Sequence, residues 1–422
     1  MRYLLIRHIA SCQCRCISHL KLVLLGLIFV MPIARLHAQE SDIVAQGQIV
    51  KIGMSTALSG PAADLGINVR QGVEVALKQA SEKSNRQFEL VALDDGYEPA
   101  RTIPNMRELI NDKQVTAIIG NVGTPTSVVA LPIAKQQNVC FFGAYTGAGV
   151  LRRTPPDRQV FNYRASYAQE TAAMVHGLVQ QGGMAPTNIA IFTQRDSYGD
   201  AGYSGAMDAL RSEGLTETDR VIHERYDRNS LCVEDAVSRI LLADHVPKAI
   251  IMVGAYAPCA KFIRLVRESG INPVFLNVSF VGTEPLIKAL GAFGEGVIIT
   301  QVVPHPMADL PVVNAYRKAM LQYAPDASLN FGSLEGYIAT VIFSHALDRI
   351  EGSVTRENII VALGQLGTFD IGLDEQMSFS QMDHQASDRV WPTVIRQQKA
   401  LPLDWSQLRD RVEPVRLGGA GE

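Results

Sequence analysis

From residue 49 onward, short apolar runs alternate with longer stretches in which apolar residues recur at helical spacing. Runs rich in β-branched residues, such as Val115–Ile119, are typical of strands buried in a parallel sheet. The stretch 66–83 places Val69, Val73, Ala76 and Ala80 on one helix face. The pattern therefore predicts repeated strand–helix units.

The rhythm runs through nearly the whole chain. Strands are expected at 49–54, 88–93, 115–119, 139–143, 160–164, 188–193, 220–226, 248–253, 273–278 and 296–303. Helices are expected at 66–83, 99–111, from 124 onward, and at 170–181, 199–213, 233–244, 260–269, 311–323, 333–351 and 356–366. Such alternation indicates two doubly wound parallel sheets covered on both faces. The absence of a low-complexity linker favours two lobes that share a cleft.

One strand end suggests an anion site. Gly120 and Gly123 allow a tight turn after Val115–Ile119. Thr124 is expected to be an N-cap, with Pro125 at the first helical position. A helix N-terminus at the carboxyl edge of an open sheet suits an anionic group such as a carboxylate. An ordinary strand-to-helix turn is the alternative.

Composition excludes several classes of protein. The 422 residues carry a net charge of −3, which argues against nucleic acid as the main partner. A hydrophobic fraction of 47% with 19% charged residues fits a globular protein with sizeable cores. After residue 40, no apolar run is long enough to span a bilayer.

The first 38 residues resemble an export signal. Basic residues precede the apolar run 22–34, which is short for a membrane helix but suits a signal-peptide core. We predict cleavage near Ala38–Gln39 and a periplasmic location; an uncleaved anchor is the alternative. Three cysteines, Cys12, Cys14 and Cys16, would leave with the signal.

Three cysteines remain in the exported chain. Cys140 lies in an apolar strand and is expected to be a buried thiol. Cys232 and Cys259 each follow a strand, and an oxidising compartment permits a disulfide between them. The sequence does not decide between this disulfide and two free thiols, because it does not show the distance between the Cα atoms of the two cysteines.

Catalytic signatures are weak in the sequence. It contains no nucleophile elbow, zinc-protease motif or phosphate-binding loop, and its histidines lack metal-ligand spacing. Asp94 and Asp95 are interpreted as a solvated cap, and Glu335 as bonding the start of its helix. The sequence therefore predicts no enzyme activity, cofactor or metal.

A series of motifs resembles one family. The motifs are Ile52-Gly53 with Leu58-Ser59-Gly60, Leu93-Asp94-Asp95-Gly96-Tyr97, Ile118-Ile119-Gly120 with Thr124–Ser127, Asp196-Ser197-Tyr198-Gly199, and Phe331 with Ser333-Leu334-Glu335-Gly336-Tyr337. Their order and spacing resemble the branched-chain amino-acid-type periplasmic binding proteins of ABC importers, over residues 49–392.

The resemblance implies a type I periplasmic-binding fold, an α/β architecture of two doubly wound lobes joined by crossing strands. It implies that the lobes close on a small solute and that the closed form is presented to a membrane permease, the protein acting as a monomer. Lobe 1 is expected at 47–164 with 302–368, lobe 2 at 165–301 with 369–400, and a tail at 401–422. Strand ends near Arg164 and Val303 are expected to bend as hinges.

Family contacts carry over to particular residues. Thr124 matches the hydroxyl residue that receives the ligand carboxylate. Tyr145 and Thr146 match main-chain and hydroxyl contacts in the next loop. Tyr198 and Tyr256 match aromatic residues of the second lobe.

Two positions depart from the family's amino-acid binders. Leu65 stands where they usually carry an aromatic residue. Ser279 and its neighbours lack the acid that pairs with the ligand ammonium, and a buried ammonium without a counter-charge is costly. We therefore expect an amine-free carboxylate, an amide or an aromatic acid as the solute. Arg164 either supplies a positive charge or faces solvent.

Other functions share this fold. A ligand-sensing subunit of a signalling system would carry the same motifs, and a hydrolase on a doubly wound fold is a further alternative.

Overall fold

The computed structural model describes residues 48–409. The predicted signal peptide (1–38), with its cleavage site, and the chain after residue 409 lie outside the described residues. Among residues 48–409, no helix is both long and apolar enough to cross a membrane.

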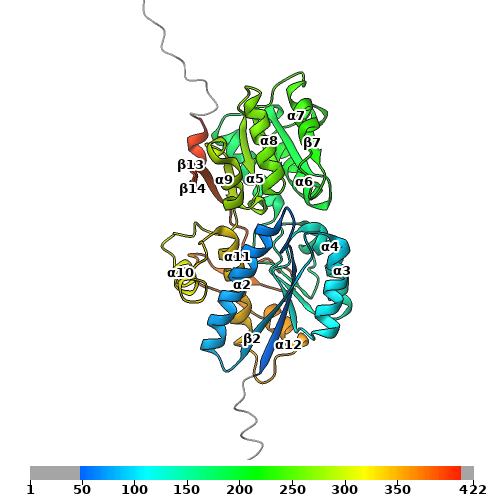
Figure 1. Ribbon diagram of the computed structural model, residues 1–422, viewed down its shortest axis with the longest axis vertical. Coiled ribbons are helices and arrows are strands. Elements are labelled where there is room, and N and C mark those ends of the chain that lie inside the picture. The colour runs from blue at the N-terminus through cyan, green and yellow to red at the C-terminus, as the bar shows by residue number, and fades with distance from the viewer. Residues whose placement is uncertain (1–47, 410–422) are drawn as a thin grey trace, which may run out of the picture. The chain divides into compact units, whose positions relative to one another are not determined.

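The first sheet contains five parallel strands in the order β2-β1-β3-β4-β5 (Figure 1). These are β1 (Ile49–Thr56), β2 (Gln87–Asp94), β3 (Ala117–Ile119), β4 (Cys140–Phe142) and β5 (Val160–Phe161). The strand order reverses between β1 and β3, and open α/β sheets bind ligands beyond the carboxyl ends of the strands at such a switch point.

The second sheet repeats this winding. Its order is β14-β13-β10-β9-β8-β6-β7, with β10 to β7 parallel and the last two strands of the chain added antiparallel. The strands are β6 (Ile189–Gln194), β7 (His223–Tyr226), β8 (Ala249–Val253), β9 (Val274–Asn277), β10 (Ile298–Gln301), β13 (Trp391–Arg396) and β14 (Lys399–Pro402). Its switch point lies between β6 and β8.

Each sheet and the helices around it form what we call the first half and the second half (Figure 1). The first half has α2 (Ala63–Lys83), α3 (Pro99–Arg107), α4 (Thr124–Gln136), α10 (Pro311–Tyr323), α11 (Phe331–Leu347) and α12 (Arg356–Gly364). The second half has α5 (Tyr167–His176), α6 (Ser197–Ser212), α7 (Glu234–Leu241), α8 (Tyr256–Glu268) and α9 (Thr283–Leu290). Segments Glu108–Asp112 and Gly177–Gln181 continue α3 and α5 as π-helical turns.

One unexpected helix and one different N-cap depart from the sequence interpretation, and several other helices begin two to four residues earlier than expected. Helix α9 was not expected, since glycines flank it and Pro285 lies inside it. Helix α4 begins at Thr124, and its N-cap is Gly123. The prediction of Thr124 as N-cap is wrong, because Gly123 takes φ = 99° beside the Tyr97 ring, which leaves no room for a Cβ atom. The Thr124 hydroxyl faces Thr146 instead.

The segments that connect the halves bond to one another. The Tyr163 hydroxyl donates to the Val302 carbonyl at 3.0 Å, and the Ser387 amide donates to the Tyr163 carbonyl at 2.9 Å. The residues 369–400 contribute to both halves. The hairpin of β11 (Gly367–Phe369) and β12 (Met377–Phe379) packs its rings near Phe142 and Phe161, whereas β13 and β14 extend the second sheet.

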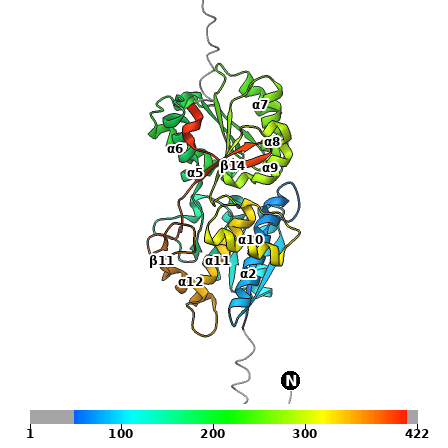
Figure 2. The same cartoon turned by 90° about the vertical axis from the view of Figure 1, so that its left-hand side faces the viewer.

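Helices α2 and α11 pack closely side by side, as Figures 1 and 2 show. Glycines make the approach possible: a Cβ atom on Gly72 would lie 1.8 Å from the Ser333 carbonyl oxygen, and one on Gly336 would lie 2.3 Å from the Val69 carbonyl oxygen. This contact fixes α11, and with it Glu335, against the first sheet.

We expect Gly72→Ala to lower the free energy of unfolding by about 3 kcal/mol, because the new methyl group meets backbone that cannot rotate away. Urea denaturation of the purified protein measures the change. Gly149→Ala is the matched control, since nothing lies within 4 Å of its Cβ position. Equal urea midpoints for Gly72→Ala and Gly149→Ala would contradict the close packing of α2 on α11.

Candidate functional site

The carboxyl ends of both sheets meet between the two halves. The Gln194 side-chain amide, at the end of β6, donates to the Tyr97 hydroxyl at 3.1 Å. The Tyr145 hydroxyl, in the loop after β4, reaches the Ser279 carbonyl at a long 3.5 Å. Both sheets thus direct polar side chains to one place, which we call the inter-half site.

A chain of hydroxyl groups crosses the inter-half site. Thr124 Oγ1 lies 2.7 Å from Thr146 Oγ1, and Thr146 Oγ1 lies 3.3 Å from the Tyr167 hydroxyl. Thr124 is the first residue of α4, so the chain begins at the positive end of a helix dipole. These groups can donate hydrogen bonds to an anionic or carbonyl oxygen.

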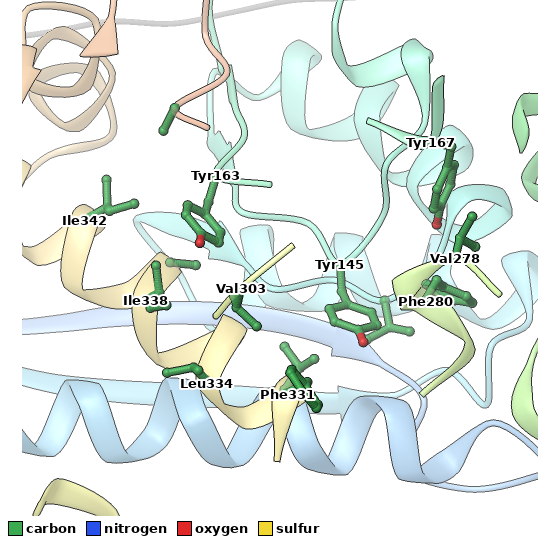
Figure 3. Close-up of a cluster of buried hydrophobic side chains, with 14 of the residues drawn as sticks. Tyr145, Tyr163, Tyr167, Val278, Phe280, Val303, Phe331, Leu334, Ile338 and Ile342 are labelled. Atoms are coloured by element: carbon green, nitrogen blue, oxygen red, sulfur yellow. The ribbon is translucent and has the colours of Figure 1, made fainter. Parts of the chain in front are cut away.

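An aromatic ring fills the middle of this site. Phe280 follows β9, and its ring centroid lies 4.6 Å from that of Tyr198, 5.5 Å from Tyr145 and 5.8 Å from Tyr97. Figure 3 shows the rings of Tyr145 and Phe280 side by side. Two of the three tyrosines belong to the first half, whereas Phe280 and Tyr198 belong to the second.

A buried ion cluster lies beside the rings. Arg164, 1% exposed, donates to Glu170 Oε1 at 3.1 Å and to Glu335 Oε1 at 3.3 Å, and it also bonds the Ser279 hydroxyl. Its guanidinium carbon lies 5.0 Å from the Tyr145 ring centroid and 5.8 Å from that of Tyr167. Arg164 is therefore buried at the site, and the solvent-facing alternative is wrong.

Glu170 fixes the turn that carries Phe280. Its Oε2 accepts from the Ser279 amide at 2.7 Å and from the Thr300 hydroxyl at 2.7 Å, and its Oε1 accepts from the Ser279 hydroxyl at 3.0 Å. Together with Arg164, these donors occupy the carboxylate. Ser279 is consequently committed to structure on both its amide and its hydroxyl.

Glu335 lies on α11 with its side chain 7% exposed. Burial raises its pKa to about 7, while the Arg164 guanidinium opposes this shift and Glu170 adds to it. The expectation that Glu335 bonds the start of its helix is wrong: the N-cap is Asn330, whose side chain accepts from the Ser333 amide. Helix packing turns Glu335 toward Arg164 instead.

The rim of the site carries further contacts between the halves. Tyr256 is half-buried, and burial together with the adjacent Asp64 raises its pKa to about 12. The Leu65 side chain lies beside Gly282. On another stretch of the rim, Arg228 pairs with Glu98 at 2.9 Å and with Asp196 at 3.0 Å.

The Asp94-Asp95 pair holds a loop, as a cap would, but Asp95 is fully buried and not solvated. It accepts from the Ser55 hydroxyl at 2.8 Å, the Tyr97 amide at 2.9 Å and the Thr102 hydroxyl at 3.0 Å. Tyr97 takes φ = 63° in this loop, which directs its ring to the site. Asp95 thus positions Tyr97.

Of the two alternatives for Cys232 and Cys259, the structure has two free thiols and no disulfide. Cys140, Cys232 and Cys259 are all free thiols; Cys232 is exposed, whereas Cys259 is buried beneath Gly254. Cys140 is a buried thiol, as expected, and burial raises its pKa. Within residues 48–409, no three His, Cys, Asp or Glu side chains gather where they could hold a metal ion.

Comparison with known proteins identifies the family and the fold. The sequence profile of a periplasmic binding protein family matches residues 49–400. A crystal structure of a possible leucine/isoleucine/valine-binding protein from Rhodopirellula baltica is 49% identical and superposes with a TM-score of 0.84, covering 86% of this chain and 98% of that one.

The chain belongs to this family of periplasmic binding proteins.

More distant relatives show the same fold. The Leu/Ile/Val-binding protein homolog 7 of Brucella abortus is 23% identical over 72% of this chain and 78% of its own length. A leucine-binding protein from Thermotoga maritima is 21% identical, with a TM-score of 0.73 over 84% of this chain and 98% of that one. The predicted type I periplasmic-binding fold is confirmed.

The binding protein brings most of the predicted site residues together. Tyr145 and Tyr198 pack on Phe280, and Ser279 bonds to Arg164. Thr124 and Thr146 form the chain of hydroxyls, whereas Leu65 and Tyr256 lie at the rim. The sequence analysis missed Tyr97, Tyr167, Glu170 and Phe280 as members of the site. Only Tyr97 had a signal, because it closes the Asp94-Asp95-Gly96-Tyr97 motif.

We expect the buried Glu335 to make stability depend on pH. Since its pKa is raised, its contribution is fully present below its ordinary pKa near 4.5 and is lost as pH rises through about 7. This rise is about 2.5 pKa units, so at about 1.4 kcal/mol per unit the loss is on the order of 3 kcal/mol. Chemical denaturation at several pH values should show this loss in the native protein and not in Glu335→Gln.

Glu268→Gln, at an exposed position at the end of α8, is the control and should follow the native curve. Parallel curves for the native protein and Glu335→Gln would contradict a raised pKa for Glu335.

Proposed function

We propose that the protein captures a small solute at the inter-half site by closing its two halves and delivers it to the membrane permease of an ABC importer. The observation that carries the proposal is the convergence of strand ends from both sheets on one cluster of hydroxyls and rings. The motif series and the export signal support a periplasmic solute carrier, acting as a monomer without a cofactor.

The two carboxylates of the ion cluster are already paired, which favours an amine-free carboxylate or an amide as the solute. An α-ammonium group needs an unpaired carboxylate. Glu170 is occupied by Ser279, Thr300 and Arg164, and Glu335 faces Arg164. Thr124 at the start of α4 offers a hydroxyl and a helix N-terminus to the solute's oxygen atoms.

The closing motion needs contacts that form only between the halves. Arg228 with Glu98, Asn229 with Glu98, and Gln194 with Tyr97 join residues of different halves. In this proposal the two halves rotate about the crossing segments near Tyr163 and Val302, which are hydrogen-bonded to each other.

We expect Thr124→Ala to weaken carboxylate binding about 10- to 100-fold, since a hydrogen bond to a charged oxygen contributes about 1.5–3 kcal/mol. Thermal shift and calorimetry with acetate, propionate, isobutyrate, acetamide, L-valine and L-leucine measure it. A solute concentration of 100 times Kd adds about 2.7 kcal/mol to the free energy of unfolding, which a melting curve detects readily.

Thr124→Ser keeps the hydroxyl and should retain affinity, and Thr216→Ala, at an exposed position, is the surface control. Unchanged affinity in Thr124→Ala would remove this residue from the site. L-valine or L-leucine as the preferred solute would keep the transport function and refute the amine-free solute.

We expect Arg228→Ala to favour the open form several-fold, because it removes a partly buried ion pair worth about 1 kcal/mol. Distances between one spin label on each half, measured without solute, report the two populations. Arg195→Ala is the control, since Arg195 pairs with Asp227 in its own half. Identical distance distributions in the native protein and Arg228→Ala would show that the Arg228–Glu98 ion pair does not stabilise the closed form.

A further inference from the structure

The turn after β9 directs two neighbouring side chains to different surroundings. Val281 packs into the apolar cluster of the second half with Phe275 and Leu286. Phe280, fully buried, leaves that cluster and enters the inter-half site among the tyrosines. An apolar side chain thus occupies the space that two separating halves would expose.

The backbone under this ring is held from three sides. The Ser279 amide and hydroxyl both donate to Glu170, the Arg164 guanidinium contacts the Ser279 hydroxyl, and Tyr145 reaches the Ser279 carbonyl. Gly282 ends the turn at φ = 80°, where an L side chain would be strained. Anchored in this way, the turn cannot swing the Phe280 ring out of the site without breaking buried hydrogen bonds.

We propose that Phe280 is the specificity-determining residue of the inter-half site: its fixed ring limits the solute to a short, compact carboxylate or amide. This inference rests on the proposed function. The solute's oxygen atoms meet the Thr124 and Thr146 hydroxyls, and its carbon atoms meet the ring. A longer chain or an aromatic group competes with Phe280 for the same space.

The test compares solutes of graded size. Native protein and Phe280→Ala are titrated by calorimetry with acetate, propionate, butyrate, hexanoate, benzoate and phenylacetate. The native protein should prefer the short acids by 10-fold or more. Phe280→Ala should bind hexanoate, benzoate or phenylacetate at least 10-fold more tightly than the native protein does, while losing affinity for propionate.

Two variants guard against trivial explanations. Phe280→Leu keeps most of the apolar contact and should shift the preference part of the way even if Phe280→Ala unfolds. Phe293→Ala, in the loop after α9 and away from the inter-half site, should leave the preference unchanged.

The outcomes separate the two proposals. A native protein that binds short acids, with variants that show the same order of preference, overturns the role of Phe280 and leaves the binding function standing. A native protein that binds hexanoate or benzoate as tightly as propionate also overturns the size limit. If neither native nor variant protein binds any of these acids, the size limit set by Phe280 is overturned; if acetamide, L-valine and L-leucine do not bind either, the binding function is overturned as well.

Discussion

The buried charge cluster of Arg164, Glu170 and Glu335 constrains the rest of the binding protein. Arg164 lies on a crossing segment, Glu170 on α5 of the second half and Glu335 on α11 of the first, so one guanidinium ties three parts of the chain together. Burying a charge is tolerable only when partners compensate it. The close packing of α2 on α11 holds Glu335 in position, and the hydrogen bonds of Ser279 hold Glu170.

The site is assembled from loops at the carboxyl ends of strands in two sheets with the same winding order. Each half alone presents a partial surface: hydroxyls and Tyr145 from the first, Tyr198 and Phe280 from the second. The ion pairs of Arg164 fix the position of these surfaces relative to each other, and the aromatic rings determine the shape of the site. The structure thereby combines a buried ionic interior with ion pairs at its rim that join the two halves.

Much of the fold was predictable because local signals agreed with it. Helix Pro311–Tyr323 matches its expected bounds, and the β–α rhythm predicted the parallel strands within a few residues. The failures have local causes. Helix α9 lacks a clean signal between its glycines, and Thr124 is a good N-cap in isolation that loses the role to Gly123 because of Tyr97.

Periodicity and motif spacing are local properties, so the fold class, the family and the candidates Thr124, Tyr145 and Tyr198 could be predicted from the amino-acid sequence. The surroundings of these residues depend on contacts that form only in the folded chain. The tertiary structure buried Arg164, turned Glu335 away from its helix start, left Cys232 and Cys259 unbonded and placed Phe280 among the tyrosines. Several of these contacts join residues far apart in the chain, such as Arg164 and Glu335, which are 171 positions apart, and no local pattern encodes such a contact.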